Sequence, residues 1–479
     1  MNILQAIDDP DLFASGFADR ATWAAWRAFL AALFGLPMSP DQLTLFTQCT
    51  GRSIAPLVAA REAWLACGRR AGKSYILALI AVYLAVARDY AQCLAPGERA
   101  TILILAADRK QSRVIFRYVA ALLKGVPMLA RMIENERAES FDLTTRVTIE
   151  VGTNNYRSVR GYAFAAVLCD EIAFWRSDDS ASPDYEVLTA VKPGMATIPG
   201  AMLLCASSPY ARRGALYDAH QKHHGKDGPV LVWQAATRTM NPTVPQSFID
   251  EEMERDPAKT RAEYLAEFRT DIERFITIEA VEACIEFGIR ERAPERHWHY
   301  FAFVDPSGGS GDAFTLVIGH LDGDRVLIDC IREVPSPFSP EQVVAEFAQT
   351  CKSYRITKVT GDNFGGEWPK EAFRKHGIAY ERSDKPKSQL YQALLPLINS
   401  SRILLLDNDR LLHELVGLER RTARGGRDTI DHSPGGHDDV ANAVAGVGAY
   451  LAAQPPDHGW AALVAKCFQH EPSGDANAA

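Results

Sequence analysis

Two sets of side chains in this sequence have the types and spacing of groups that handle phosphate. The first lies in residues 67–74, which read Cys-Gly-Arg-Arg-Ala-Gly-Lys-Ser. They fit the end of the phosphate-loop pattern G-x-x-x-x-G-K-[ST], but Cys67 replaces the first glycine and Gly68 comes one position late. In such a loop backbone N–H groups face polyphosphate, Lys73 reaches the β- and γ-phosphates, and Ser74 binds Mg²⁺. The alternative is a chance Gly-Lys-Ser before an ordinary buried helix.

An acid pair, Asp170-Glu171, follows an apolar run that begins at Phe164. This order predicts two carboxylates at the carboxyl end of a buried strand. There Asp170 would hold the Mg²⁺ shell and Glu171 would polarise the attacking water. The alternative is an acid pair that caps the next helix. The joint presence of a phosphate loop upstream favours the catalytic interpretation.

Three more polar residues lie close to these motifs. Arg160 comes ten residues before Asp170, and it is either an arginine finger acting on a neighbouring subunit or a surface arginine on a turn. Ser207 and Ser208 follow the apolar run 201–206. They would sense the γ-phosphate or form an ordinary Ser/Thr turn, and the sequence alone favours the turn.

The second set consists of aspartates in the C-terminal half. Asp305 and Asp362 each end an apolar strand, and Asp438-Asp439 opens a helix. Carboxylates from three elements suit two-metal phosphodiester hydrolysis, which needs two Mg²⁺ or Mn²⁺ ions roughly 3.5–4 Å apart. Each aspartate alone has a simpler role as a turn former or helix cap. Either acid of the last pair can be the ligand, and Asp439 is favoured.

The elements that must position these groups have the pattern of two α/β halves. Continuous apolar runs without polar alternation predict buried strands of a parallel sheet in the first half. Three runs joined by tight Gly/Asp turns predict an antiparallel meander in the second. The expected helices are 22–34, 75–87, 111–123, 340–354 and one from 437, and the expected strands are 100–107, 144–151, 164–169, 201–206, 299–305, 313–320, 325–331 and 356–362.

The length and composition predict at least two domains. A chain of 479 residues exceeds one typical core, and 47% hydrophobic with 23% charged residues is typical of a globular protein. We expect an N-terminal helical region and ATPase domain over 1–240 and a polar, helical lid or linker over 241–296. The nuclease domain is expected over 297–453, followed by a disordered tail over 454–479. The polar, helical character already begins near residue 215.

The net charge of −8 argues against a wholly basic nucleic-acid binder but permits a local basic surface. Basic residues near the second set could contact DNA phosphates or form a solvated charge run; they are Lys385, Lys387, Arg420, Arg421, Arg424 and Arg427. Nine cysteines without a C-x-x-C pair predict reduced thiols and no structural zinc. No signal peptide or membrane segment is predicted.

The combination resembles the large subunit of tailed-phage terminase, the DNA-packaging motor of bacteriophages. The resemblance covers about residues 45–450. It rests on the stretches 67–74, 167–171, 207–209, 303–305, 361–362, 387–402, 418–421 and 436–439. It implies an α/β protein with an N-terminal ASCE-type P-loop ATPase domain, built on a parallel sheet, and a C-terminal RNase H-like nuclease domain.

The resemblance also implies roles for individual residues. Asp170 would bind Mg²⁺, Glu171 would be the base of ATP hydrolysis, and Arg160 would act in trans. Ser207 and Ser208 would fall in a coupling motif. Residues implied to bind nucleotide are Gly68, Arg69, Arg70, Ala71, Gly72, Lys73 and Ser74; those implied to bind the nuclease metals are Asp305, Asp362 and Asp439, with Asp438 as the open alternative. Either Arg69 or Arg70 could replace Arg160 as the finger. The family's last helix often has another aspartate where this chain has Asn442.

The implied cofactors are ATP with Mg²⁺, and two Mg²⁺ or Mn²⁺ ions for the nuclease. The implied partners are double-stranded DNA, a portal protein, a small terminase subunit and further copies of the chain in a ring, usually a pentamer. Such a protein acts in the host cytoplasm and, during virion assembly, transiently at the portal vertex of the procapsid; it is absent from the mature virion. The competing hypotheses are a host helicase–nuclease of DNA repair and a non-catalytic, nucleotide-gated scaffold that binds the portal.

Overall fold

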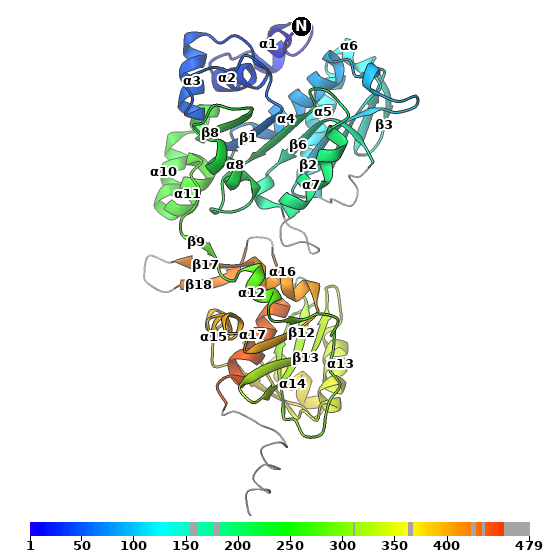
Figure 1. Cartoon of the computed structure of the whole chain (residues 1–479), viewed down its shortest axis with the longest axis vertical. Helices are drawn as coiled ribbons and strands as arrows, with labels where there is room; N and C mark the ends of the chain where they lie inside the picture. The colour runs from blue at the N-terminus through cyan, green and yellow to red at the C-terminus, as the bar shows by residue number, and fades with distance from the viewer. Residues whose placement is uncertain are drawn as a thin grey trace, which may run out of the picture. The chain divides into compact units, whose positions relative to one another are not determined.

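The computed structural model describes residues 1–153, 161–175, 183–309, 312–362, 367–422, 428–433 and 436–454. The chain forms two compact units, 1–272 and 273–479, each with its own large sheet (Figure 1). The division falls inside the segment 241–296, for which the sequence predicts a lid or linker. Within the described residues, no helix is both long and apolar enough to cross a membrane.

The N-terminal unit contains an eight-stranded sheet with the order β3-β4-β5-β2-β6-β7-β1-β8. Neighbours from β5 to β8 are parallel, and β3, β4 and β5 pair antiparallel. Because β6, β7 and β1 are parallel neighbours, their carboxyl ends meet at one edge. The strands are β1 (Glu62–Cys67), β2 (Ala100–Ala106), β3 (Ile133–Glu136), β4 (Ser140–Leu143), β5 (Val147–Thr153), β6 (Ala163–Asp170), β7 (Met202–Ser207) and β8 (Val230–Ala235).

Helices cover both faces of this sheet (Figure 1). In β2, Ile102 and Ile104 pack on one side whereas Leu103 and Leu105 pack on the other, as the two-residue period of a strand requires. The first face is covered by α1 (Ile3–Asp8), α2 (Ala24–Leu33), α3 (Pro40–Thr50), α4 (Lys73–Ala87), α5 (Arg109–Lys124) and α6 (Pro127–Ala130). The second is covered by α7 (Pro183–Met195) and α8 (Ala215–His223), and the short helices α9 (Thr237–Met240), α10 (Gln246–Arg255) and α11 (Pro257–Leu265) follow β8.

The predicted parallel sheet is confirmed, but its edge was incompletely predicted. The apolar runs near 100, 147, 164 and 202 all form strands, and helices occupy 73–87 and 109–124. Four strands of this sheet were not predicted: β1 before the phosphate loop, β3 and β4 at the other edge, and β8 inside the segment expected to be helical. The β1 sequence is rich in Ala and Leu, which have high helix propensity, so pairing with β7 and β8 decides its structure.

The C-terminal unit contains a seven-stranded sheet with the order β10-β16-β13-β12-β11-β14-β15. The predicted antiparallel meander is confirmed in β11, β12 and β13, and β14 pairs with β11 in parallel. The strands are β10 (Ile285–Glu286), β11 (Tyr300–Asp305), β12 (Phe314–Asp322), β13 (Arg325–Val334), β14 (Lys358–Gly361), β15 (Ala379–Arg382) and β16 (Ile403–Leu406). A three-stranded sheet contains β9 (Ile272–Arg274), β17 (Leu418–Thr422) and β18 (Asp428–His432).

Helix α17 (Asp439–Leu451) lies directly on β11 and β12 (Figure 1). A Cβ atom at Gly446 would lie 2.3 Å from the Phe303 ring, so only glycine permits this approach. This close packing brings the start of α17 to the end of β11. The other helices are α12 (Ile278–Glu282), α13 (Pro340–Ser353), α14 (Trp368–Lys375), α15 (Lys387–Asn399) and α16 (Asp409–Gly417), of which α13 and α14 pack in a core with β11 and β12.

Candidate active sites

The loop between β1 and α4 joins a buried strand to a helix, as the phosphate-loop pattern requires, but its first glycine is at position 68 instead of 67. Cys67 is the buried last residue of β1, and α4 begins at Lys73 after Gly72, whose φ is +103°. A Cβ atom at Gly68 would lie 2.2 Å from Thr237 Oγ1. The close approach that demands glycine therefore occurs at position 68, and a cysteine is accommodated at 67.

Three side-chain donors hold the carbonyl groups of this loop. Thr237 Oγ1 donates to the carbonyl of Arg69 at 2.8 Å, and Asn241 Nδ2 donates to that of Arg70 at 2.8 Å. Trp26 Nε1 donates to the carbonyl of Ala71 at 2.7 Å. In a trans peptide the carbonyl and the following N–H point in opposite directions. The N–H groups that follow these carbonyls therefore point away from the three donors, an orientation that suits an anion site.

Lys73 and Glu171 form an ion pair beside the loop. Lys73 Nζ is 3.1 Å from Glu171 Oε1 and donates to Ser208 Oγ and to the Cys67 carbonyl, both at 3.1 Å. The other oxygen of Glu171 accepts from the Ser208 N–H at 3.0 Å and from the Ser207 hydroxyl at 3.1 Å. Both serines thus hydrogen-bond to Glu171 of the acid pair, which is more than an ordinary Ser/Thr turn would do.

Asp170 has the surroundings of a metal-binding carboxylate. Its Oδ2 accepts from Ser74 Oγ at 2.7 Å and from Gln111 Nε2 at 2.9 Å. Its Oδ1 is buried and has no hydrogen-bond partner among the described residues. Burial, together with the charge of Glu171, raises the pKa of Asp170 to about 6. A divalent cation would satisfy the unpaired oxygen and favour the ionised form, so this donor set fits Mg²⁺.

The sequence did not single out several contacts of this first site. Trp26, Gln111, Thr237 and Asn241 are four such residues, each from an element outside the motifs. Gln111 had a usable signal, since it follows the apolar strand β2 at the sheet edge where β6 also ends. Arg160, the predicted finger, lies outside the described residues.

The other finger candidates are Arg69 and Arg70, and a third arginine, Arg52, lies upstream of the loop. Arg69 lies 3.4 Å from Glu263, whose carbonyl accepts the Arg69 N–H, and Arg70 is exposed. Buried Arg52 donates to the carbonyls of Gly228 and Val230 and so holds the chain that enters β8.

The C-terminal unit places three of the predicted metal ligands near enough for the charges of Asp362 and Asp439 to act on Asp305. Asp305 ends β11 and Asp362 follows β14, and these strands are parallel with Val304 opposite Gly361. Their next residues therefore emerge at the same edge. Asp439 is the first residue of α17, and its Oδ2 accepts from the N–H of Ala313 at 3.2 Å.

The other two carboxylates act electrostatically on Asp305. Burial raises the pKa of Asp305 well above its usual value, and the charges of Asp439 and Asp362 raise it further. Asn442 opposes the shift by donating to Asp305 Oδ2 at 2.8 Å. Burial also raises the pKa of Asp439. Clustered carboxylates of this kind fit hard divalent cations, which would balance their charge.

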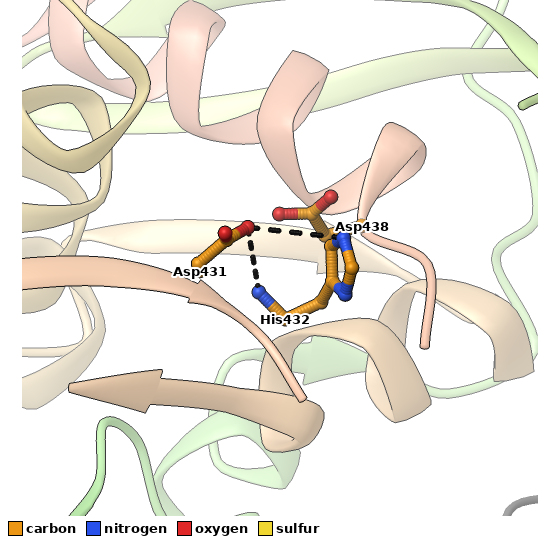
Figure 2. Close-up of side chains that lie close together, drawn as sticks. All are labelled: Asp431, His432 and Asp438. Atoms are coloured by element: carbon orange, nitrogen blue, oxygen red, sulfur yellow. Dashed lines mark hydrogen bonds and ion pairs between the residues drawn. The ribbon is translucent and has the colours of Figure 1, made fainter. Parts of the chain in front are cut away.

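Asp438 and Asp439 have different partners although they are adjacent. The Asp438 carboxylate accepts from Lys387 Nζ at 2.8 Å and from the Tyr391 hydroxyl at 2.8 Å. Figure 2 shows Asp431 and His432 of β18 turned toward Asp438, and ligand atoms of the three lie within 4.8 Å of one another. Lys387 Nζ also donates to Asp431 at 3.2 Å, so an ammonium group already neutralises this cluster.

The described basic residues near this centre all have local partners. Lys385 lies over the Tyr450 ring with its Nζ 5.1 Å from the centroid. Arg420 pairs with Asp428. Arg421 lies 3.4 Å from Glu419. Arg424 and Arg427 lie outside the described residues.

Similarity to known proteins is confined to solved structures. No protein-family model matches the sequence, and no curated protein matches it. The large terminase of bacteriophage HK97 is similar at 15% identity, covering 89% of this chain and 99% of that one with a TM-score of 0.39. The large terminase of a thermophilic bacteriophage, solved in complex with ADP, is similar at 11% identity, 82% and 94% coverage and TM-score 0.36. The large terminase nuclease of the thermophilic phage G20c with bound magnesium is similar at 19% identity over 36% of this chain and 96% of that one, with TM-score 0.32.

Proposed function

We propose that this chain is a terminase large subunit, an ATP-hydrolysing motor that moves double-stranded DNA into a viral procapsid. Its second activity is a metal-dependent endonuclease that cuts concatemeric DNA. The observation that supports this proposal is the presence of two separate carboxylate centres in one chain. One lies beside a phosphate-type loop in the N-terminal unit. The other lies in the C-terminal unit, at the ends of β11 and β14 and the start of α17.

The N-terminal centre suits ATP hydrolysis. Ser74 and Asp170 would hold Mg²⁺, which neutralises charge on the β- and γ-phosphates. Lys73 lies between the loop carbonyls and Glu171, so a γ-phosphate that attracts its ammonium group would loosen the ion pair with Glu171. Glu171 could then orient and polarise water. A movement of Glu171 would be coupled to the end of β7 through its hydrogen bonds with Ser207 and Ser208.

The C-terminal centre suits phosphodiester hydrolysis. Asp305, Asp362 and Asp439 would hold two Mg²⁺ or Mn²⁺ ions, which supply Lewis acidity and an activated water. Asn442 keeps Asp305 oriented through one amide hydrogen bond. The amide oxygen Oδ1 of Asn442 is buried and has no hydrogen-bond partner among the described residues. The centre therefore contains a buried, unpaired amide oxygen as well as the carboxylates.

The proposal includes the partners and the location of such a motor. They are double-stranded DNA, a portal protein, a small terminase subunit and further copies of this chain in a ring, in the host cytoplasm and transiently at the procapsid portal. Arg160 would act on the nucleotide of a neighbouring copy. Of the segment 241–296, for which the sequence predicts a lid or linker, residues 241–272 belong to the N-terminal unit. They would serve as a lid, because Asn241 and Glu263 contact the phosphate-type loop.

Paired activity assays on the full chain test this function. Wild type should hydrolyse ATP and, with Mn²⁺, cut a supercoiled plasmid. Lys73→Ala should lose ATP hydrolysis and keep plasmid cutting, and Asp362→Ala should do the reverse. Wild type lacking both activities would contradict the enzymatic proposal and favour a scaffold.

The motor function needs a further assay. An ATP-driven translocase displaces a third strand from a triplex on double-stranded DNA without separating the duplex. In complex with procapsids that contain a portal, we expect wild type to displace the third strand and leave a forked duplex intact. Unwinding of the fork would instead support a helicase–nuclease.

A further inference from the structure

The first turn of α17 receives its hydrogen-bond acceptor from another helix. The first N–H groups of any α-helix lack partners within the helix, and adjacent Asp, Asn or Ser residues usually accept from them. Here Asp438 precedes the helix but makes no side-chain cap bond, because Lys387 and Tyr391 engage its carboxylate. Residues 439–442 are buried, so solvent is a poor substitute.

Glu414 of α16 supplies the missing acceptor. Its Oε2 accepts from the N–H of Val440 at 2.8 Å and from the N–H of Ala441 at 2.9 Å. A carboxylate at this position also interacts favourably with the positive end of the helix dipole. The long stretch of chain between Glu414 and Asp439 hides this relation in the sequence.

Arg410 fixes the other oxygen of Glu414. Arg410 Nε donates to Glu414 Oε1 at 2.9 Å, one helical turn away on α16, and lies 2.8 Å from a carboxylate oxygen of Glu333. The same guanidinium also faces the nuclease centre, with Nη2 3.8 Å from Asp439 Oδ2. The side chain of Glu414 is only 5% exposed. Both oxygens are thus held before any ligand arrives, which makes Glu414 a rigid support for α17.

We propose that Glu414 is a positioning residue for the nuclease metal centre: by capping α17 from outside, it leaves Asp439 available as a metal ligand. This inference rests on the nuclease function proposed above. Without the Glu414 carboxylate, two buried N–H groups would lack an acceptor. The nearest acidic side chains, Asp438 and Asp439, would compete to replace it, and Asp439 would then turn away from Asp305.

Three substitutions of Glu414 separate the effect of side-chain length from the effect of the negative charge. Glu414→Gln retains an oxygen at the same reach, Glu414→Asp keeps the charge but is one methylene too short, and Glu414→Ala removes both. Partners of metal ligands typically change metal affinity by 10–100-fold when removed, so we expect about a tenfold higher half-saturating Mn²⁺ concentration for Asp and Ala. The Gln variant should stay within about threefold of wild type, because its amide oxygen still caps the helix.

Two readouts on the full chain test the inference. The first is the Mn²⁺ dependence of plasmid cutting, in which saturating Mn²⁺ should restore the rate of the Asp variant. The second is the Mn²⁺-induced rise in melting temperature without DNA or nucleotide, corrected for the shift that remains in Asp305→Asn. Asp409→Asn, an exposed acid on the same helix, is the matched control and should match wild type.

The outcomes distinguish a failure of the positioning role from a failure of the proposed nuclease function. If wild type neither cuts DNA nor responds to Mn²⁺, the nuclease proposal fails. If wild type responds and Glu414→Asp has an unchanged Mn²⁺ requirement, the positioning role is wrong. The role is also wrong if Gln impairs metal binding more than Asp, because charge rather than reach would then matter. If Ala does not fold, the comparison of Gln with Asp decides between these results.

Discussion

The two carboxylate centres differ in what their nearby cations do. In the N-terminal unit Lys73 pairs directly with Glu171, so a protein cation lies within the centre itself. In the C-terminal unit the ammonium group of Lys387 binds Asp438. The Arg410 guanidinium bonds to Glu414 at 2.9 Å and lies farther, 3.8 Å, from the Asp439 carboxylate. The pKa of Asp305 is instead raised, first by burial and then by the charges of the neighbouring carboxylates.

This difference indicates which ligand each centre is prepared for. A lysine beside oriented N–H groups attracts a polyanion, and one metal ion then suffices to complete the charge balance. Mutually repelling carboxylates attract cations, and two divalent ions relieve that repulsion. The same residue types thus suit nucleotide binding in one unit and phosphodiester cleavage in the other. Four experiments test this contrast.

The largest effect is expected at Asp305. We expect Asp305→Asn to lower Mn²⁺-dependent plasmid cleavage by about 10³-fold or more, because a metal ion contributes several kcal/mol to transition-state stabilisation. ATP hydrolysis should be unchanged, since Asp305 and the phosphate-type loop belong to different units. Asp322→Asn, an exposed acid at the end of β12, is the control. Near-normal cleavage by Asp305→Asn would contradict the assignment of DNA cleavage to the C-terminal centre.

Glu171 should show the reverse pattern. Loss of a general base typically costs about 10²–10⁴-fold, so Glu171→Gln should lower ATP turnover by about that factor while nucleotide binding persists. Plasmid cleavage should not change. Turnover by phosphate release and binding by a fluorescent nucleotide analogue give the two measurements, with exposed Glu186→Gln as control. Full turnover in the mutant would exclude Glu171 as the base.

The raised pKa of Asp170 predicts a pH-dependent stability of the metal-free protein. An unfolded aspartate has a pKa near 3.8 and the folded one about 6, so between these values the native state holds more protons. Stability should therefore fall as pH rises from about 4 to 6, by on the order of 3 kcal/mol. Urea unfolding in EDTA, followed by tryptophan fluorescence, measures this fall.

The variant Asp170→Asn isolates this contribution. It lacks the titrating group, so the part of the pH slope that comes from Asp170 should disappear, and Mg²⁺ should no longer stabilise the N-terminal unit. An identical pH slope in wild type and variant would show that burial of Asp170 does not disfavour its charge.

The smallest effect is expected where the phosphate-type loop is held from outside. Thr237→Val removes one hydrogen bond to the Arg69 carbonyl, and a net hydrogen bond contributes about 1 kcal/mol. We expect about a fivefold higher KM for ATP with little change in kcat. Thr239→Val on the same short helix is the control. An unchanged KM would mean that the loop keeps its conformation without this donor.

Much of the fold and of both centres could be predicted from local sequence. The run that ends at Asp170 is continuously apolar because both faces of its strand are buried, and the position of the acids at its end needs only that pattern. Asp305 and Asp362 follow the same logic. The helix 73–87 could also be predicted from a continuous apolar run, because it is buried and its apolar residues lie on all sides.

The tertiary structure alone decided which distant groups complete each centre. Trp26, Thr237 and Asn241 reach the first centre because of strand order and helix placement, which short-range patterns do not encode. The sequence allowed either Asp438 or Asp439 to be the ligand and favoured Asp439. The packing of α15 and α16 against α17 gives the physical reason. Lys387 engages the Asp438 carboxylate, Glu414 caps the helix in its place, and the Asp439 carboxylate stays near enough to Asp305 to act on its pKa.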